Sequence, residues 1–430
     1  MLTLLITLDC VRADHVLGDQ ADTPALDRFR GEAVTFTSAY AHSNTTLPSH
    51  VTLFTGLLMP EHGVDHNFFR PTEEHLFLAE CFRERGLPAA GFVGIEFLAK
   101  LFASHLDGGD RYYDLPKGRL MRGLARRMGV RGQRRGAAKT LESALDWILG
   151  PSEGRGFCWA HLFDTHQDYQ AGRAWRRRYK VPEEPSSEPL DRVLQKEHLA
   201  SLHPVQGERH PIEYYPRLYQ ASVSETDALL GLMFARLKAE GLWEKALIVV
   251  TADHGENLTE HGVYCGHPLI FDETIHVPLL IKFPGGEGRG REVALQVGHE
   301  DVLPTILGCN GWPCDRGRGV DLAAVLSGAG GPARPSFAFH NRMYQASVRM
   351  EGATWIENLD LSKVEAPLLY LYEATGLYDR EGRRLDDPAL AQRLRTTLSE
   401  YLSRSVQKRA VPVLEDESIK DQLRGLGYME

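Results

Sequence analysis

Two apolar runs, each followed at once by an aspartate, constrain the fold of this chain more than any other feature. Residues 2–8 precede Asp9, and residues 246–252 precede Asp253 and His254. Continuous apolar runs of this length are typical of strands inside a parallel sheet that is covered on both faces. Because ligands bind at the carboxyl ends of such strands, the pattern predicts that both aspartates lie at the functional edge of one sheet.

The order of the remaining segments predicts an α/β fold with a large, mostly parallel sheet flanked by helices over residues 1–330. After about residue 330 the expected strands become shorter, and a helix is expected from about 388 to 403. This change predicts a smaller C-terminal α+β lobe over residues 331–430. Residues 170–215 are polar and show no clear period, which indicates a surface excursion and makes them a candidate lid over the site.

Composition narrows the class of protein without defining it. A net charge of −9 and a pI near 6.1 argue against a general nucleic-acid binder. The six cysteines show no C-x-x-C spacing, so neither a zinc knuckle nor a disulfide scaffold is indicated. The apolar stretch after Met1 is too short for a signal peptide or a membrane span, so a cytoplasmic protein without a span is expected. No heptad marks an oligomer interface, so the oligomeric state stays open.

A basic stretch covers residues 111–139, where ten Lys or Arg face the single acid Asp114. Two interpretations are open: a patch for a polyanion or a membrane surface, or a solvated helical hairpin that happens to be basic.

The segment around Thr46 has the features of a nucleophile at a helix start. Pro48 suits the first turn of a helix, so Thr46 is expected at or just before its N-terminus. Unpaired N–H groups and the helix dipole favour an anion there. A hydroxyl held there beside a metal can attack phosphorus or sulfur. The alternative is that Thr46 is simply an N-cap.

Asp9, Thr46, Asp253 and His254 together form a donor set for a divalent cation. The oxygens suit Ca²⁺, Mg²⁺ or Mn²⁺, and the imidazole is better tolerated by Mn²⁺ or Zn²⁺. A single ion, Mn²⁺ or Ca²⁺ before Mg²⁺ or Zn²⁺, is the simplest expectation.

In the order of its motifs the chain resembles the sulfatase group of the alkaline phosphatase superfamily. The matching stretches run over nearly the whole chain and are residues 8–15, 23–27, 46–50, 55–56, 62–64, 161–169, 251–256, 261–262, 266–267, 277–279, 299–305, 377–379 and 423–428. Each stretch is weak by itself, and the ordered set is specific.

This resemblance implies a two-lobed fold with the site above the large sheet. It implies that Asp9, Asp253 and His254 bind metal and that Thr46 occupies the nucleophile position. His166 and His267 are then expected to approach the substrate, one of them protonating the leaving oxygen and the other holding the anionic oxygens. Three further residues are predicted to bind substrate: Arg12, His50 and Asn67. His161 ranks lower, because a strand histidine is more often a satisfied core residue.

The departures from the family pattern concern the same site. Sulfatases of this group carry Cys or Ser, oxidised to formylglycine, where this chain has Thr46, and Thr cannot give that aldehyde. His50 replaces the Arg of the family signature, and Cys10 replaces a frequent second acidic ligand. The Asp-x-x-x-Gly-His signature of members with two metals is half present, beginning at Asp227. A second metal would need residues such as His261, His267 and His299.

A threonine in the nucleophile position therefore favours attack on phosphorus over attack on sulfur. We expect a metal-dependent hydrolase of phosphate or phosphonate esters, with diesters favoured, that acts through a covalent Thr46 intermediate. Its substrate is expected to be a small-molecule or polymer-attached anionic ester. The alternatives are a sulfatase that uses unmodified Thr, a phosphoryl-alcohol transferase, and a catalytically silent metal-binding module.

Overall fold

The fold is described from a computed structural model of the chain. It describes residues 1–72, 75–102, 135–201, 205–328, 334–340, 344–360, 362, 375–405 and 411–412. Most of the basic 111–139 stretch, the predicted C-terminal motif at 423–428 and part of the lobe beyond residue 330 lie outside these residues.

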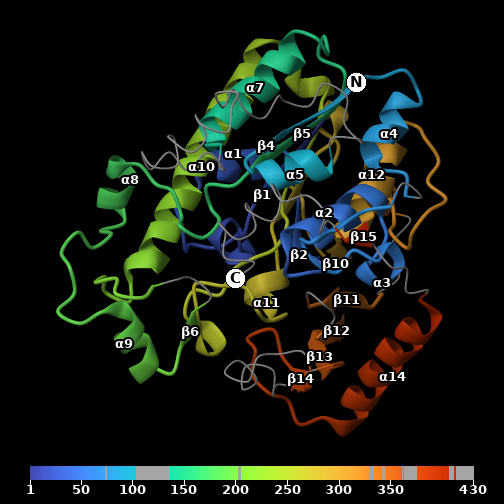
Figure 1. The fold of residues 1–430 in the computed structure, drawn as a ribbon. Helices are drawn as coiled ribbons and strands as arrows, with labels where there is room; N and C mark the ends of the chain where they lie inside the picture. Colours follow the sequence, from blue (N-terminus) through green and yellow to red (C-terminus); the bar gives the residue numbers. More distant parts are fainter. Residues whose placement is uncertain are drawn as a thin grey trace.

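A seven-stranded sheet forms the centre of the molecule (Figure 1), in the order β10-β2-β9-β7-β1-β5-β4. All neighbouring pairs are parallel except those made by β9, which runs antiparallel to both β2 and β7. The predicted large, mostly parallel sheet is confirmed. Its strands are β1 (Leu2–Leu8), β2 (Val34–Tyr40), β4 (Ala89–Val93), β5 (Gly156–Leu162), β7 (Leu247–Ala252), β9 (Leu279–Lys282) and β10 (Glu292–Gly298).

The register of the central strands brings the two predicted aspartates to one edge. Leu8, the last residue of β1, pairs with Leu162 of β5 on one side and with Ala252 of β7 on the other. The amide of Asp9 donates to the Leu162 carbonyl at 2.9 Å. Asp9 and Asp253 are therefore the first residues past two adjacent parallel strands, as the sequence predicted.

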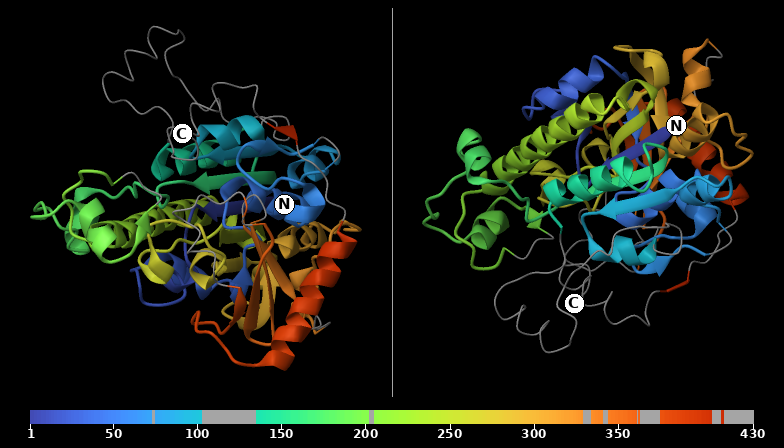
Figure 2. Two further views of the ribbon diagram at one scale, coloured as in Figure 1. Left: turned by 60° about the horizontal axis from the view of Figure 1, so that its bottom comes forward. Right: turned by 90° about the horizontal axis from the view of Figure 1, so that it is seen from above.

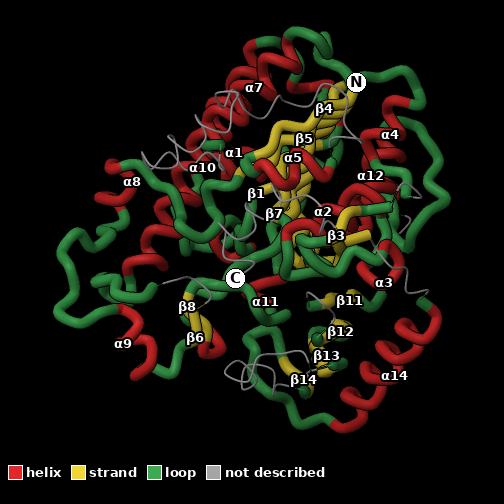
Figure 3. The backbone as a smooth tube through the Cα atoms, in the orientation of Figure 1, coloured by secondary structure: helices red, strands yellow, loops and turns green. Residues whose placement is uncertain are grey.

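Helices cover both faces of this sheet, and the alternation of side chains along β1 shows how. Leu4, Ile6 and Leu8 belong to one buried cluster, whereas Leu5 belongs to the other. The first face carries α1 (Pro24–Arg30), α7 (Ala137–Leu149) and α10 (Tyr214–Ala239). The second carries α2 (Thr46–Thr55), α4 (Leu78–Arg83), α5 (Glu96–Leu101) and α12 (Val302–Cys309). Figure 3 shows the strands running between these two helical layers.

A smaller antiparallel sheet lies beside the large one and packs against α14 (Figure 2). Its strands, in sheet order, are β11 (Ser336–Phe339), β12 (Gln345–Met350), β13 (Ala353–Asn358) and β14 (Gly376–Tyr378), and α14 spans Pro388–Arg404. Leu394 and Leu398 of α14 are buried against this sheet. Helix α14 falls close to the position predicted for it, about 388 to 403. The Phe339 amide donates to the His42 carbonyl at 2.9 Å, so the small sheet touches the segment that leads into α2.

The polar 170–215 segment is an excursion at the periphery that carries two short helices (Figure 1). It contains α8 (Arg173–Arg178), α9 (Leu190–Lys196) and β6 (Ala200–Ser201), which pairs with β8 (Val263–Tyr264). Its role as a lid stays a prediction. The remaining short elements are α3 (Met59–His62), β3 (Phe69–Arg70), α11 (Asp272–Ile275), α13 (Leu322–Leu326) and β15 (Val411–Pro412).

Candidate active site

Asp9, Asp253 and His254 form a compact, fully buried group at the carboxyl edge of the large sheet. One ligand atom from each lies within 4.8 Å of the others. Oδ1 of Asp253 accepts the amides of Cys10 at 3.1 Å and His254 at 2.8 Å. Its Oδ2 is buried and has no hydrogen-bond partner among the described residues. A buried, unpaired carboxylate oxygen is costly, so this donor set fits a divalent cation.

The hydroxyl of Thr46 lies next to this group. Thr46 is the first residue of α2, and its Oγ1 is 3.4 Å from Nε2 of His254. The N-cap position belongs to Thr45, which makes no side-chain capping bond. The interpretation of Thr46 as a simple N-cap is therefore wrong. Nδ1 of His254 contacts the Gly255 carbonyl at 2.9 Å, so Nδ1 carries the proton and Nε2 keeps its lone pair for a metal.

His50 lies beneath the start of α2, in a hydrogen-bonded chain that begins in the sheet. The indole of Trp159 donates to Thr7 Oγ1 at 2.9 Å, and that hydroxyl contacts Nε2 of His50 at 3.1 Å. Nδ1 of His50 then donates to the Thr46 carbonyl at 2.7 Å. Burial is the first cause that lowers the pKa of His50 to about 3, so the ring is neutral. Its hydrogen bonds in the structure go to the protein, and its predicted contact with substrate remains a prediction.

His161, which the sequence analysis ranked below the other histidines, contacts the predicted metal ligand Asp9. Its Nε2 contacts Oδ2 of Asp9 at 3.1 Å, and its Nδ1 is buried without a partner among the described residues. The expectation of a satisfied core histidine is therefore wrong. His161 pairs in register with Thr7, and this alignment across two strands cannot be read from the local sequence.

His166 and His267 lie beside the group that could hold a metal, which consists of Asp9, Asp253 and His254. Their ring centroids are 6.0 Å apart, and the His267 ring is 4.5 Å from that of His254. The side chain of His267 is 11% exposed, whereas the side chain of Glu256 behind it is fully buried. His166 stacks on Phe163 at 4.4 Å and contacts the Gln167 carbonyl through Nδ1 at 3.3 Å.

Glu256 sets the proton arrangement of His267. Its Oε1 lies 3.3 Å from Nδ1 of His267, and its Oε2 accepts from the Tyr169 hydroxyl at 3.1 Å. Burial raises the pKa of Glu256 to about 8 and lowers the pKa of His267 to about 4. A Glu256 carboxyl that holds its proton donates to Nδ1 of His267, and the ring proton then lies on Nε2, from which it can be donated to an anion.

Asn67 also reaches the start of α2. Its Oδ1 accepts the Leu47 amide at 2.9 Å, and its Nδ2 is buried without a partner among the described residues. Asn67 therefore contacts the residue after Thr46 and keeps a buried donor that is suited to an ester oxygen, and its predicted contact with substrate remains a prediction.

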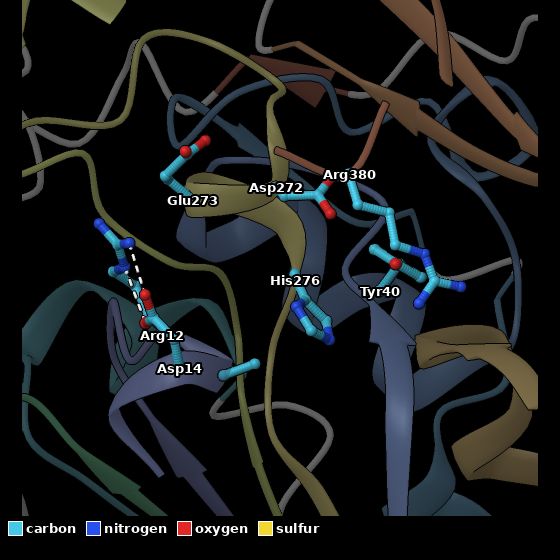
Figure 4. A pocket seen from close by; sticks show the side chains of 8 residues that line it. Arg12, Asp14, Tyr40, Asp272, Glu273, His276 and Arg380 are labelled. Atoms are coloured by element: carbon cyan, nitrogen blue, oxygen red, sulfur yellow. Dashed lines mark hydrogen bonds and ion pairs between the residues drawn. The ribbon is translucent and has the colours of Figure 1, made fainter. Parts of the chain in front are cut away.

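Arg12 is held at the side of the site. Its guanidinium donates to Asp14 at 2.6 Å and to Glu260 at 2.7 Å. Figure 4 shows the pairing of Arg12 with Asp14 at the wall of a cavity of about 230 Å³, which Tyr40 and Arg380 also line. Two carboxylates therefore already balance the charge of Arg12, and its predicted contact with substrate remains a prediction.

The expected residues of a second metal site do not meet in the described part of the chain. His261 contacts Glu273 at 2.9 Å, and His299 contacts the Ala252 carbonyl at 3.0 Å. Asp227 instead accepts the amides of Ala25 at 2.9 Å and Leu26 at 2.7 Å. It thus caps α1, whose N-cap residue Thr23 makes no side-chain capping bond.

The sequence analysis did not predict that Ser49 contacts the predicted metal ligand Asp253. The hydroxyl of Ser49 donates to the Asp253 carbonyl at 2.5 Å and contacts Nδ1 of His299 at 3.1 Å. Ser49 lies one turn from the start of α2, so this bond ties α2 to the end of β7. The Ser-His pair of residues 49 and 50 was visible as a motif, but its target across the sheet was not.

Solved structures of similar fold place the chain in a class. A phosphonate monoester hydrolase from Silicibacter pomeroyi superposes with a TM-score of 0.70 at 20% identity, covering 94% of this chain and 96% of that one. A structure in complex with its substrate D-glucosamine-2-N,6-O-disulfate gives a TM-score of 0.69 at 15% identity, covering 96% and 99%. These similarities assign the chain to the class of proteins with the alkaline phosphatase and sulfatase fold.

Within that class, the chain belongs to the sulfatase family, whose model matches residues 2–312. Members of this family depend on a divalent metal. An ulvan-active sulfatase from Formosa agariphila is 27% identical over an alignment of 339 residues that covers 71% of this chain and 60% of that protein. A multifunctional alkaline phosphatase superfamily protein, PehA of Trinickia caryophylli, is 24% identical over 379 residues, covering 71% and 72%. The chain thus spans less than two thirds of the first of these relatives.

None of the helices in the described part of the chain combines the length and the apolar composition that a bilayer crossing requires.

Proposed function

We propose that this protein hydrolyses phosphate or phosphonate esters, with diesters preferred, through a covalent intermediate on Thr46. The observation that carries the proposal is the contact between Thr46 Oγ1 and His254 Nε2 at 3.4 Å, beside the carboxylates of Asp9 and Asp253. This contact supports the proposal, because an ion held there would stabilise an alkoxide on Thr46 and because a helix start favours an anion.

Asp9, Asp253 and His254 would hold one divalent ion, with Thr46 as a fourth donor. When bound there, such an ion supplies Lewis-acid stabilisation of negative charge on oxygen. The buried and unpartnered Oδ2 of Asp253 supports this assignment.

The residues around the group divide the proton transfers. Thr46 loses its proton to solvent and forms the Oγ–P bond while the bond from phosphorus to the alcohol oxygen breaks. His166, whose Nδ1 is oriented by the Gln167 carbonyl, gives a proton to the leaving oxygen. His267 donates from Nε2 to a non-bridging oxygen, and Asn67 donates from Nδ2. In the second half of the reaction, a water molecule gives a proton to His166 and its oxygen attacks phosphorus. The bond between phosphorus and Thr46 Oγ1 breaks, and Thr46 regains a proton from solvent.

The side chain of Thr46 is the reason for preferring phosphorus. Oxidation of a secondary alcohol cannot give the formylglycine aldehyde, and a phospho-threonine is released by attack of water at phosphorus. The similarity to a phosphonate monoester hydrolase and to PehA supports this choice. The relatives named as sulfatases favour the second candidate, hydrolysis of sulfate esters by unmodified Thr46.

A paired ester assay tests the proposal. Phosphodiester, phosphonate and sulfate esters of one aryl alcohol are compared at equal concentration, with Thr46→Val as the control because it keeps the β-branch and loses the hydroxyl. We expect turnover of the phosphorus esters to exceed that of the sulfate ester, and Thr46→Val to abolish it. Faster turnover of the sulfate ester would contradict the proposal and favour the second candidate. Transfer of the phosphoryl-alcohol group to an added alcohol, in place of water, would favour a transferase.

A further inference from the structure

Cys10 occupies a strained position at the centre of the site. Its φ of +60° lies in the left-handed region of the backbone map, which residues other than glycine rarely adopt. Two hydrogen bonds hold it there: its amide donates to Asp253 Oδ1 at 3.1 Å, and its carbonyl accepts from the Tyr219 hydroxyl at 2.8 Å. The backbone is thus fixed so that the thiol lies at the carboxyl edge of β1, 3.2 Å from Asp9 Oδ1. Strain that the surroundings impose in this way is a feature of functional sites.

The thiol belongs to two groups of metal-ligating side chains. It lies within 4.8 Å of ring nitrogens of His254 and His267, and in a second group within 4.8 Å of ligand atoms of Asp9 and His166. All of these residues are buried except His267, which is partly exposed. The unpartnered Oδ2 of Asp253, itself fully buried, lies 3.6 Å from Nε2 of His254 in the same place. Two of the three residues that would hold the ion, Asp9 and His254, therefore each have a ligand atom within 4.8 Å of the Cys10 sulfur.

We propose that Cys10 is a thiolate ligand of the ion held by Asp9, Asp253 and His254, and that it makes the site selective for thiophilic cations such as Zn²⁺ over Ca²⁺ and Mg²⁺. The inference rests on the metal position of the proposed function and narrows the choice of ion. Zn²⁺ takes thiolate, imidazole and carboxylate ligands together, and Cys10, His254, Asp9 and Asp253 would provide this donor set. Thiolate favours soft and borderline ions, whereas Ca²⁺ and Mg²⁺ favour oxygen alone. The thiol releases its proton to solvent as the ion binds.

Cobalt substitution tests this assignment without any substrate. Co²⁺ is titrated into the metal-free protein, and absorbance is recorded in the visible, where bound Co²⁺ absorbs, and in the near ultraviolet, where a thiolate-to-cobalt charge-transfer band appears. The variants are Cys10→Ser, Cys10→Asp and, as the thiol control, Cys309→Ser at the end of α12. Asp tolerates a positive φ, so Cys10→Asp is the variant best able to keep the backbone, and circular dichroism checks the fold of each.

We expect the charge-transfer band in the unmodified protein and in Cys309→Ser. Both Cys10 variants should lose it while keeping the visible bands. In competition against Co²⁺, Cys10→Asp should raise the relative affinity for Ca²⁺ by about tenfold or more. Visible bands without a charge-transfer band in the unmodified protein, or a band that survives in Cys10→Ser, would overturn the inference.

The same experiment separates this inference from the proposed function. Thr46→Ala carries no change at sulfur, so it should keep the charge-transfer band even though it is expected to lose ester hydrolysis. A protein that shows the band but turns over no ester would reject the ester chemistry and leave the cysteine ligand in place. A protein that binds no Co²⁺ at all would overturn both.

Discussion

The hydroxyl oxygen of Thr46 lies 3.4 Å from Nε2 of His254, although the two residues are 208 positions apart in the chain. The contact joins the first residue of α2 to the turn after β7. The contact thus joins Thr46, predicted as a nucleophile from its place at a helix start, to His254, which was predicted to bind metal together with the aspartates at two strand ends.

Asp253→Asn should separate metal binding from folding. Because Oδ2 of Asp253 has no hydrogen-bond partner among the described residues, the amide should leave the stability of the metal-free protein nearly unchanged. Metal affinity should fall at least about 100-fold. In the unmodified protein, an ion at about 100 times its Kd adds about 2.7 kcal/mol to the free energy of unfolding. Thermal unfolding with and without Mn²⁺ or Zn²⁺ measures the stability of the metal-free protein and the stabilisation by the ion. An undiminished metal-induced shift in Asp253→Asn would contradict the assignment of Asp253 as a metal ligand.

His166→Gln and His267→Gln should differ in their dependence on the leaving group. If His166 protonates the leaving oxygen, His166→Gln should lower kcat by about 10²–10⁴ for esters of poorly acidic alcohols and much less for an activated aryl ester. His267 is assigned to a non-bridging oxygen, so His267→Gln should lower both rates by a similar factor. A plot of log kcat against the pKa of the leaving alcohol gives the comparison. An unchanged slope in His166→Gln, or a steeper one in His267→Gln alone, would reverse these roles.

Asp227→Ala should weaken the fold and leave the metal site intact. Removing the acceptor for the amides of Ala25 and Leu26 should cost about 1–2 kcal/mol of stability, as loss of a helix cap does. Asp227→Asn keeps one acceptor and should cost less. Urea unfolding measures the stability, and metal analysis of the purified variants measures stoichiometry. Loss of a bound ion on Asp227→Asn would restore Asp227 as a metal ligand.

How far the sequence predicts this site depends on whether each residue is placed locally or by register. Asp9 and Asp253 follow apolar runs, so their place at the sheet edge was readable, and the start of α2 at Thr46 was readable from Pro48. His161 was underrated because its contact with Asp9 depends on the pairing of β1 with β5. The capping of α1 by Asp227 could not be predicted locally, because Asp227 reaches α1 only through the packing of α10.

The stability of the metal-free protein should fall as the pH is lowered below about 6.5. Burial lowers the pKa of His62 to about 3. Nδ1 of His62 accepts the Val64 amide at 3.0 Å, so the fold requires the neutral ring. The unfolded chain takes up a proton near pH 6.5 and the folded one does not, so stability is present above that pH and is lost as the pH falls toward 3.

His62→Gln isolates this contribution. Each such histidine contributes a slope of about 1.4 kcal/mol per pH unit between these limits. Urea unfolding between pH 7 and 5 in the presence of a chelator should therefore show a shallower slope in His62→Gln, by up to one proton. An equal slope in the two proteins would show that His62 is charged in the fold.

The most direct test of the central claim is the intact mass of the protein during turnover. The protein is mixed briefly with Mn²⁺ or Zn²⁺ and an activated aryl phosphate, phosphodiester, phosphonate or sulfate ester, quenched in acid and weighed, with Thr46→Ala alongside. We predict a transient phosphoryl or phosphonyl adduct that maps to the peptide containing Thr46 and is absent from Thr46→Ala. An adduct that persists in Thr46→Ala, or no adduct and no turnover in a protein that binds metal, would contradict it.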